Sequence, residues 1–144
     1  MISSLDTALL DAVVAGDLDS IRDLVRRGAD PNARSEGGRP ALCEACEFDH
    51  PAVIQLLLDL GADVDAEMED GWTALHHAID AEGDFRSQVG LPCDMRLVGP
   101  LLDAGANVNP LCRGDTPLDL AISYGHDTAT DALRQRGGRR AGDL

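Results

Sequence analysis

The stretch Gly71-Trp72-Thr73-Ala74-Leu75-His76-His77-Ala78 decides the fold of this chain, because related segments occur at regular distances from it. Its leucine, Leu75, follows Leu42 at the same interval at which Leu42 follows Leu9. A second marker, Gly-Ala followed by Asp or Asn, stands at residues 28–30, 61–63 and 105–107. Self-similarity at a fixed period of this size indicates a stack of small supersecondary units that bury their apolar faces against one another.

The spacing divides the 144 residues into four repeats within a single domain, residues 1–144. The repeats span about residues 4–34, 35–66, 67–109 and 110–140. Each is expected to hold two helices separated by a short turn, such as residues 8–15 and 18–27 in the first repeat. Ile21, Leu24 and Val25 show the i, i+3, i+4 apolar stripe of an amphipathic helix, and the stripe recurs in the second and third repeats.

The third repeat carries about 11 extra residues between its two helices, around residues 82–95. Gly83, Gly90 and Pro92 lie in this insertion, which therefore predicts a loop. Long loops in compact repeats are often functional, so the insertion is either a partner contact through residues such as Phe85 and Arg86 or a tolerated elaboration. The tail, residues 139–144, is expected to fray.

The segments at residues 71–78 and 114–121 resemble the central motif of the ankyrin repeat family. The resemblance implies an all-α fold: an ankyrin repeat solenoid of paired antiparallel helices with β-turn or hairpin loops. It also implies a non-enzymatic protein-interaction module. In this family the exposed variable positions lie in the turn before each first helix and at the end of that helix, and together they line one concave surface.

Carried onto this chain, these positions hold three of the four aromatic residues, Phe48, Trp72 and Tyr124, and the fourth, Phe85, lies in the insertion. Aromatic side chains are frequent hot spots of protein interfaces. Acidic residues, among them Glu82, surround them, so we expect a groove with aromatic anchors in an acidic field. The alternative is that these aromatic side chains pack against the next repeat. The candidate partner-binding residues are Glu36, Arg39, Glu47, Phe48, Glu69, Asp70, Trp72, Asp80, Phe85, Arg86, Arg113, Asp115 and Tyr124.

The formal net charge of −14 argues against nucleic-acid binding, because an acidic chain repels phosphate backbones. It favours a protein partner with a basic surface, or serves solubility alone. No apolar run approaches the ~18 residues of a membrane span, and the first residues lack the pattern of a signal peptide. We therefore expect a cytoplasmic protein that does not bind membranes and is a monomer when free.

Catalytic signatures such as a Gly-rich phosphate loop, HExxH or GxSxG are absent from the sequence, so we expect no enzymatic activity and no cofactor. Cys43 and Cys46 form a CxxC inside a predicted helix. They are expected to be small buried side chains, since a second closely spaced ligand pair for zinc is missing.

The predicted function is binding of a protein partner, which the chain blocks or holds. Two specific versions are a bacterial immunity protein that neutralises a toxin and a protein similar to the four-repeat kinase inhibitors. The alternatives from other classes are a small zinc or redox protein that uses Cys43 and Cys46, and a purely structural subunit of a larger complex.

Overall fold

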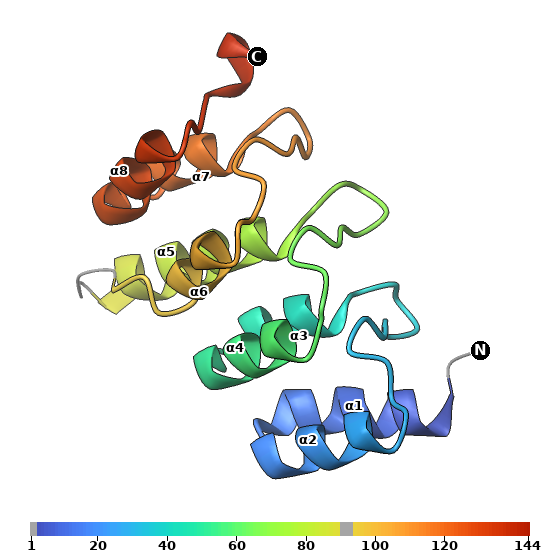
Figure 1. Ribbon diagram of the computed structural model, residues 1–144. Helices are drawn as coiled ribbons and strands as arrows, with labels where there is room; N and C mark the ends of the chain where they lie inside the picture. The colour runs from blue at the N-terminus through green and yellow to red at the C-terminus, as the bar shows by residue number, and fades with distance from the viewer. Residues whose placement is uncertain (1–2, 90–93) are drawn as a thin grey trace.

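The computed structural model describes residues 3–89 and 94–144, and it describes the side chains of these residues except those of 84–89. Helices pair antiparallel and the pairs stack in chain order, with the N- and C-termini at opposite ends of the stack (Figure 1). In the described ranges the elements are α1 (Ser4–Ala15), α2 (Leu18–Arg26), α3 (Ala41–Glu47), α4 (Pro51–Asp59), α5 (Ala74–Val89), α6 (Val98–Asp103), α7 (Pro117–Ser123), α8 (Asp127–Gln135) and the 3-10 turn η1 (Ala141–Asp143).

The hairpin turns that join the repeats project from one side of the stack (Figure 1). Each turn is closed by an isolated antiparallel bridge, between Arg34 and Pro40, Glu67 and Thr73, or Cys112 and Asp115. The expected solenoid of helix pairs with hairpin loops is thereby confirmed.

The core is built from equivalent positions of the repeats. The motif leucines Leu9, Leu42, Leu75 and Leu118 are 0–3% exposed. Ile21, Ile54 and Val98 of the second helices are fully buried. Burying one such side chain stabilises the fold by about 1.5–3 kcal/mol, so the recurring apolar positions hold the repeats together.

A hydrogen-bond ladder joins the repeats at the Gly-Ala-Asp/Asn segments. The backbone N–H of Asp63 donates to the side chain of Asn32, and that of Asn107 donates to Asp65, both at 2.7 Å. The N–H of Arg139 donates to Asn109 at 2.7 Å, which extends the ladder to the end of the stack. Each Asp or Asn thus satisfies a backbone donor of the following repeat.

The prediction of a loop at residues 82–95 is wrong for the first part of this range, because helix α5 continues to Val89. Residues 90–93 lie outside the described residues. Gly83 does not break the helix. An added Cβ there would lie 2.5–2.8 Å from three atoms of Tyr124, so glycine is needed for close packing against α7.

Glu82 replaces the missing cap of α6. Leu97, the residue before α6, makes no side-chain capping bond, and instead Glu82 Oε1 accepts the N–H groups of Leu97 at 2.6 Å and Val98 at 3.2 Å. Its Oε2 lies 2.9 Å from His126 Nε2, and both side chains are fully buried. His126 Nδ1 accepts the N–H of Ala129, so the ring proton lies on Nε2 and is donated to Glu82. Glu82 is therefore a structural residue, and its expected place in the surface acidic field is wrong.

The fraying predicted for the tail is also wrong, because polar contacts hold it. Thr116 Oγ1 donates to the carbonyl of Arg139 at 2.6 Å, and the N–H of Ala141 donates to Asp119 at 2.8 Å. Although burial opposes it, the hydrogen bonds from Ala141 and Thr116 lower the pKa of Asp119 to about 2. The tail lacks an apolar stripe, and its docking depends on these polar groups instead.

Replacing Gly83 with alanine distinguishes packing from helix propensity. Propensity alone predicts a gain of up to about 1 kcal/mol in the free energy of unfolding. The added methyl would lie only 2.5–2.8 Å from the Cβ, Cγ and Cδ2 atoms of Tyr124. We therefore expect the free energy of unfolding to fall by about 1–3 kcal/mol instead. Urea denaturation followed by circular dichroism measures the sign, and a stabilised variant would contradict the contact with Tyr124.

Replacing Glu82 with alanine removes the cap of α6 and leaves buried His126 without its acceptor. We expect the free energy of unfolding to fall by about 2 kcal/mol or more, since each unpaired buried polar group costs about 1–3 kcal/mol. Glu36→Ala on an exposed hairpin is the control and should stay within about 0.5 kcal/mol of wild type. Equal melting curves for the two variants would show that the Glu82 contacts contribute no stability.

Candidate partner-binding surface

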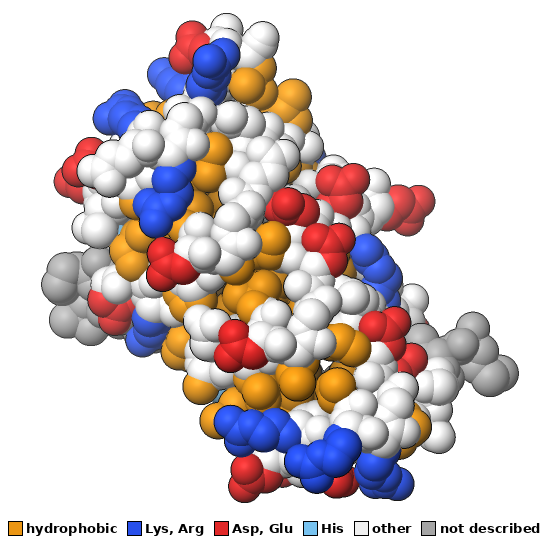
Figure 2. Space-filling model, viewed as in Figure 1, with side chains coloured by type: hydrophobic (Ala, Val, Ile, Leu, Met, Phe, Trp, Pro, Cys, Tyr) orange, Lys and Arg blue, Asp and Glu red, His pale blue; other side chains and the backbone are white. Residues whose placement is uncertain are grey.

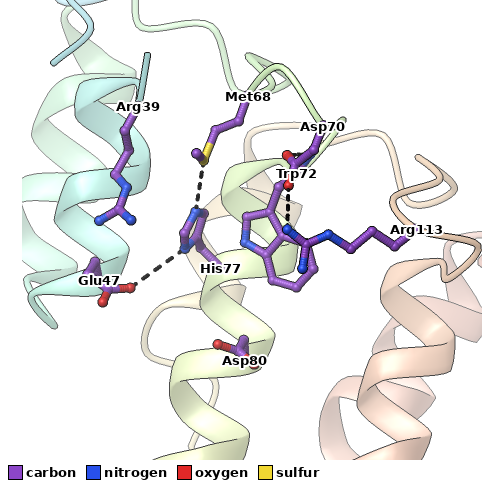
Figure 3. A pocket seen from close by; sticks show the side chains of 8 residues that line it. All are labelled: Arg39, Glu47, Met68, Asp70, Trp72, His77, Asp80 and Arg113. Atoms are coloured by element: carbon purple, nitrogen blue, oxygen red, sulfur yellow. Dashed lines mark hydrogen bonds and ion pairs between the residues drawn. The ribbon is translucent and has the colours of Figure 1, made fainter. Parts of the chain in front are cut away.

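A cavity of about 250 Å³ opens between the second and third repeats, next to the third hairpin. Its walls come from the end of α3, the first half of α5 and all three hairpin turns (Figure 3). The lining residues are Arg39, Glu47, Met68, Asp70, Trp72, His77, Asp80 and Arg113.

Trp72 is held in the cavity wall by two histidines of α5. Its ring stacks on His76, with centroids 4.9 Å apart, and meets His77 edge-on at 5.6 Å. His76 Nδ1 accepts the N–H of Thr73 at 3.2 Å, which ties the ring to the start of the helix. The indole is half-buried, so it serves the fold and still reaches the surface.

His77 forms the floor of the cavity and is 8% exposed. Its Nδ1 lies 3.8 Å from a carboxylate oxygen of Glu47, and its Nε2 lies 3.5 Å from the sulfur of Met68 (Figure 3). Burial, assisted by the nearby charge of Arg39, lowers the pKa of His77 to about 4. The ring is therefore neutral at pH 7 and does not neutralise Glu47.

Asp70 shapes the second hairpin, between Glu67 and Thr73, at the rim of the cavity. One oxygen accepts the N–H of Trp72 at 3.1 Å, and the other forms an ion pair with Arg113 at 3.0 Å (Figure 3). The hydrogen bond from Trp72, together with the charge of Arg113, lowers the pKa of Asp70. This carboxylate is charged, but Arg113 compensates it.

The structure brings six of the predicted site residues together around this cavity: Arg39, Glu47, Asp70, Trp72, Asp80 and Arg113. Sequence reasoning missed two lining residues, Met68 and His77. The signal for His77 was its position one residue after the motif histidine, on the same helix as Asp80.

The other predicted residues whose side chains the structure describes lie outside the cavity lining. Phe48 is 46% exposed just after α3, and Glu36, Glu69 and Asp115 are exposed on the hairpins. The side chains of Phe85 and Arg86 lie outside the described side chains.

Tyr124 is only half-buried, but it is committed to the fold. It packs on Gly83, and its hydroxyl donates a hydrogen bond to Asp80. It follows that Tyr124 contributes to the surface by orienting Asp80.

Cys43 and Cys46 are fully buried on α3. Burial raises the pKa of Cys43 to about 12 and the pKa of Cys46 well above its ordinary value. Among the described residues no group of three or more His, Cys, Asp or Glu side chains has the geometry to hold a metal ion. These observations favour buried thiols over the zinc or redox alternative.

Charge is unevenly distributed over the molecule. Acidic side chains gather on the side where the hairpins project, and basic side chains are most numerous at the two ends of the stack (Figure 2).

None of the helices in the described part of the chain is long and apolar enough to cross a membrane.

Residues 9–86 match the family model described as ankyrin repeats in three copies, and residues 70–112 match a further ankyrin repeat. The chain belongs to the ankyrin repeat family, and the ankyrin repeat fold is a protein–protein interaction module.

Similar proteins include regulators that carry such repeats. The chain is 33% identical to the mitochondrial disaggregase of Bos taurus over 83% of its own length and 21% of the relative. It is 37% identical to ankyrin repeat and SOCS box protein 16 of Homo sapiens over 79% of the chain and 23% of that protein. It is 42% identical to protein phosphatase 1 regulatory subunit 27 of Homo sapiens over 44% of the chain and 42% of that protein. The chain thus spans less than half of the length of each of these relatives.

The lowered pKa of His77 predicts a pH dependence of stability. In the unfolded state His77 titrates near its ordinary pKa of 6.5, so between pH 6.5 and about 4 the unfolded state binds more protons than the folded one. Stability from this residue is therefore present above pH 6.5 and is lost as the pH falls toward 4. Between pH 7 and pH 5 we expect the wild type to lose about 2 kcal/mol through His77.

Urea denaturation of wild type and His77→Asn at pH 7 and pH 5 isolates this contribution. The variant should lose less stability than wild type over the interval, whatever its stability at pH 7. Parallel losses in the two proteins would mean that His77 titrates at its ordinary pKa in the fold.

Proposed function

We propose that this chain binds a protein partner through the surface made by the cavity and the neighbouring Phe48, and that binding blocks or holds the partner. The observation that carries the proposal is the convergence of Trp72 and three carboxylates on one open cavity, and the exposed Phe48 directly follows the lining residue Glu47 in the chain.

The aromatic residues support this surface, because one of them packs within the fold and another is exposed to solvent. Tyr124 is occupied by contacts with α5, whereas Phe48 exposes 46% of its surface. The fold does not need an exposed phenylalanine, and a solvent-exposed ring beside a cavity suits a hot spot of binding. The half-buried Trp72 gives the neighbouring cavity a rigid apolar wall.

The acidic field supports a partner with a basic surface, since complementary charge accelerates association and disfavours acidic competitors. Toxin neutralisation and kinase inhibition are versions of this proposal, and the identity of the bound protein separates them. A relative named as a regulatory subunit of protein phosphatase 1 fits a regulatory role.

We place the interaction in the cytoplasm. The described cysteines Cys43, Cys46 and Cys112 are free thiols, and a reducing compartment keeps thiols in that state. We further propose that the free chain is a monomer.

The test uses the captured partner and variants of the surface. Wild type immobilised on a resin retains candidate proteins from a lysate of the source organism, and each retained protein is then purified and titrated by calorimetry. Phe48→Ala and Trp72→Ala should each weaken binding about 30-fold or more, which corresponds to about 2 kcal/mol. Leu144→Ala, which also truncates an exposed apolar side chain, is the control and should bind as wild type.

Circular dichroism must show that the variants are folded, since Trp72 also packs on histidines. A partner that binds Phe48→Ala and folded Trp72→Ala as tightly as wild type would overturn the proposed surface. Loss of binding with both variants but not with Leu144→Ala would support it.

A further inference from the structure

We propose that the cavity receives one basic side chain, arginine or lysine, from the partner protein. The inference rests on the proposed function, because it names the chemistry of the group that enters the site.

The charges that line the cavity do not cancel. Arg113 is paired with Asp70 at 3.0 Å, and Arg39 reaches Glu44, which lies outside the cavity, at 3.7 Å. The remaining lining carboxylates are Glu47 and Asp80. They form two negative charges without a cationic partner among the described residues.

The groups in direct contact with these two carboxylates are neutral. Glu47 faces His77, which is uncharged at pH 7. Asp80 accepts a hydrogen bond from the hydroxyl of Tyr124, which leaves its charge in place and holds its orientation. A guanidinium or ammonium group from outside would supply the missing positive charge and the missing donors.

Trp72 adds a second attraction for the same kind of group. The indole borders the cavity between Asp70 and Asp80 (Figure 3). A cation within about 6 Å of an aromatic ring is attracted to its π face, and tryptophan is the best of the aromatic residues for this interaction. An anionic side chain would be repelled by the carboxylates, and a purely apolar side chain would interact favourably with the indole alone.

The volume of the cavity sets the size of the occupant. Pockets for drug-sized ligands measure about 300–1,000 Å³, and this one measures about 250 Å³. It therefore suits one side chain of a partner.

The overall charge distribution also favours a basic side chain as the occupant of the cavity. Seven of the 12 arginines lie within residues 22–27 and 134–140, at the two ends of the stack. The middle of the stack, where the cavity opens, is left acidic.

The chain offers its own probe, because Trp72 is its one tryptophan. Wild type labelled with ¹⁵N is titrated with Ac-Gly-Gly-Arg-Gly-Gly-amide and with the lysine peptide of the same length, while the indole N–H signal and the tryptophan fluorescence are recorded. The neutral citrulline peptide controls for shape. We expect saturable shifts with dissociation constants on the order of millimolar for a basic peptide, and none for citrulline.

Two matched double variants test the carboxylates. Glu47→Gln with Asp80→Asn keeps the shape of the cavity and the acceptor for Tyr124, and it should weaken the peptide at least tenfold. Asp11→Asn with Asp131→Asn changes the net charge equally at exposed positions outside the cavity and should bind as wild type. The arginine and lysine titrations decide between a guanidinium and an ammonium group.

The proposal is overturned if the basic peptides give no saturable shift, if citrulline binds equally, or if the two double variants weaken binding equally. Failure of the proposed function is recognised separately. If the partner protein requires Phe48 and Trp72 but binds the Glu47→Gln, Asp80→Asn variant with unchanged affinity, the surface stands and the basic side chain does not.

Discussion

In each junction of the stack, a backbone N–H at the start of a hairpin segment donates to an Asp or Asn side chain of the repeat before it. The N–H groups of Asp63, Asn107 and Arg139 donate in this way, and within the first repeat the N–H of Asp30 donates to Asp6 at 2.9 Å. One such bond contributes only about 1 kcal/mol, but the series sets the distance between successive hairpins. Because residues of three successive repeats line the cavity, its walls meet only when this spacing is kept.

The sequence was sufficient for whatever depends on the repeat period. Leu9, Leu42 and Leu75 are evenly spaced along the chain and occupy equivalent core positions, so helix pairing and burial followed from the spacing alone. Six cavity residues were also predictable, because the family places variable residues at hairpins and helix ends. Their clustering was not, since it depends on how far each side chain reaches across the junction.

The third repeat shows where such prediction stops. Glycine is a residue type that favours turns, yet Gly83 lies within helix α5. A larger side chain there would collide with Tyr124, at the end of α7 in the next repeat. Glutamate is a residue type usually found at the surface, yet Glu82 is buried. Its carboxylate is satisfied there by hydrogen bonds from His126 and from two backbone N–H groups. In both cases the deciding partner belongs to another element, and no local pattern reports it. The tail is similar, since Asp119 and Thr116 hold it from α7.

These unpredicted contacts bear on the candidate site, because Asp80 lies on α5 close to Glu82 and Gly83. Glu82 joins α5 to α6 and α8, Gly83 lets Tyr124 approach, and Tyr124 in turn binds Asp80. A carboxylate held in this way loses little conformational freedom when it meets a ligand, and such preorganisation strengthens binding without adding contacts. The part of the insertion that forms the end of α5 therefore serves the surface indirectly, by bracing the helix that presents Asp80.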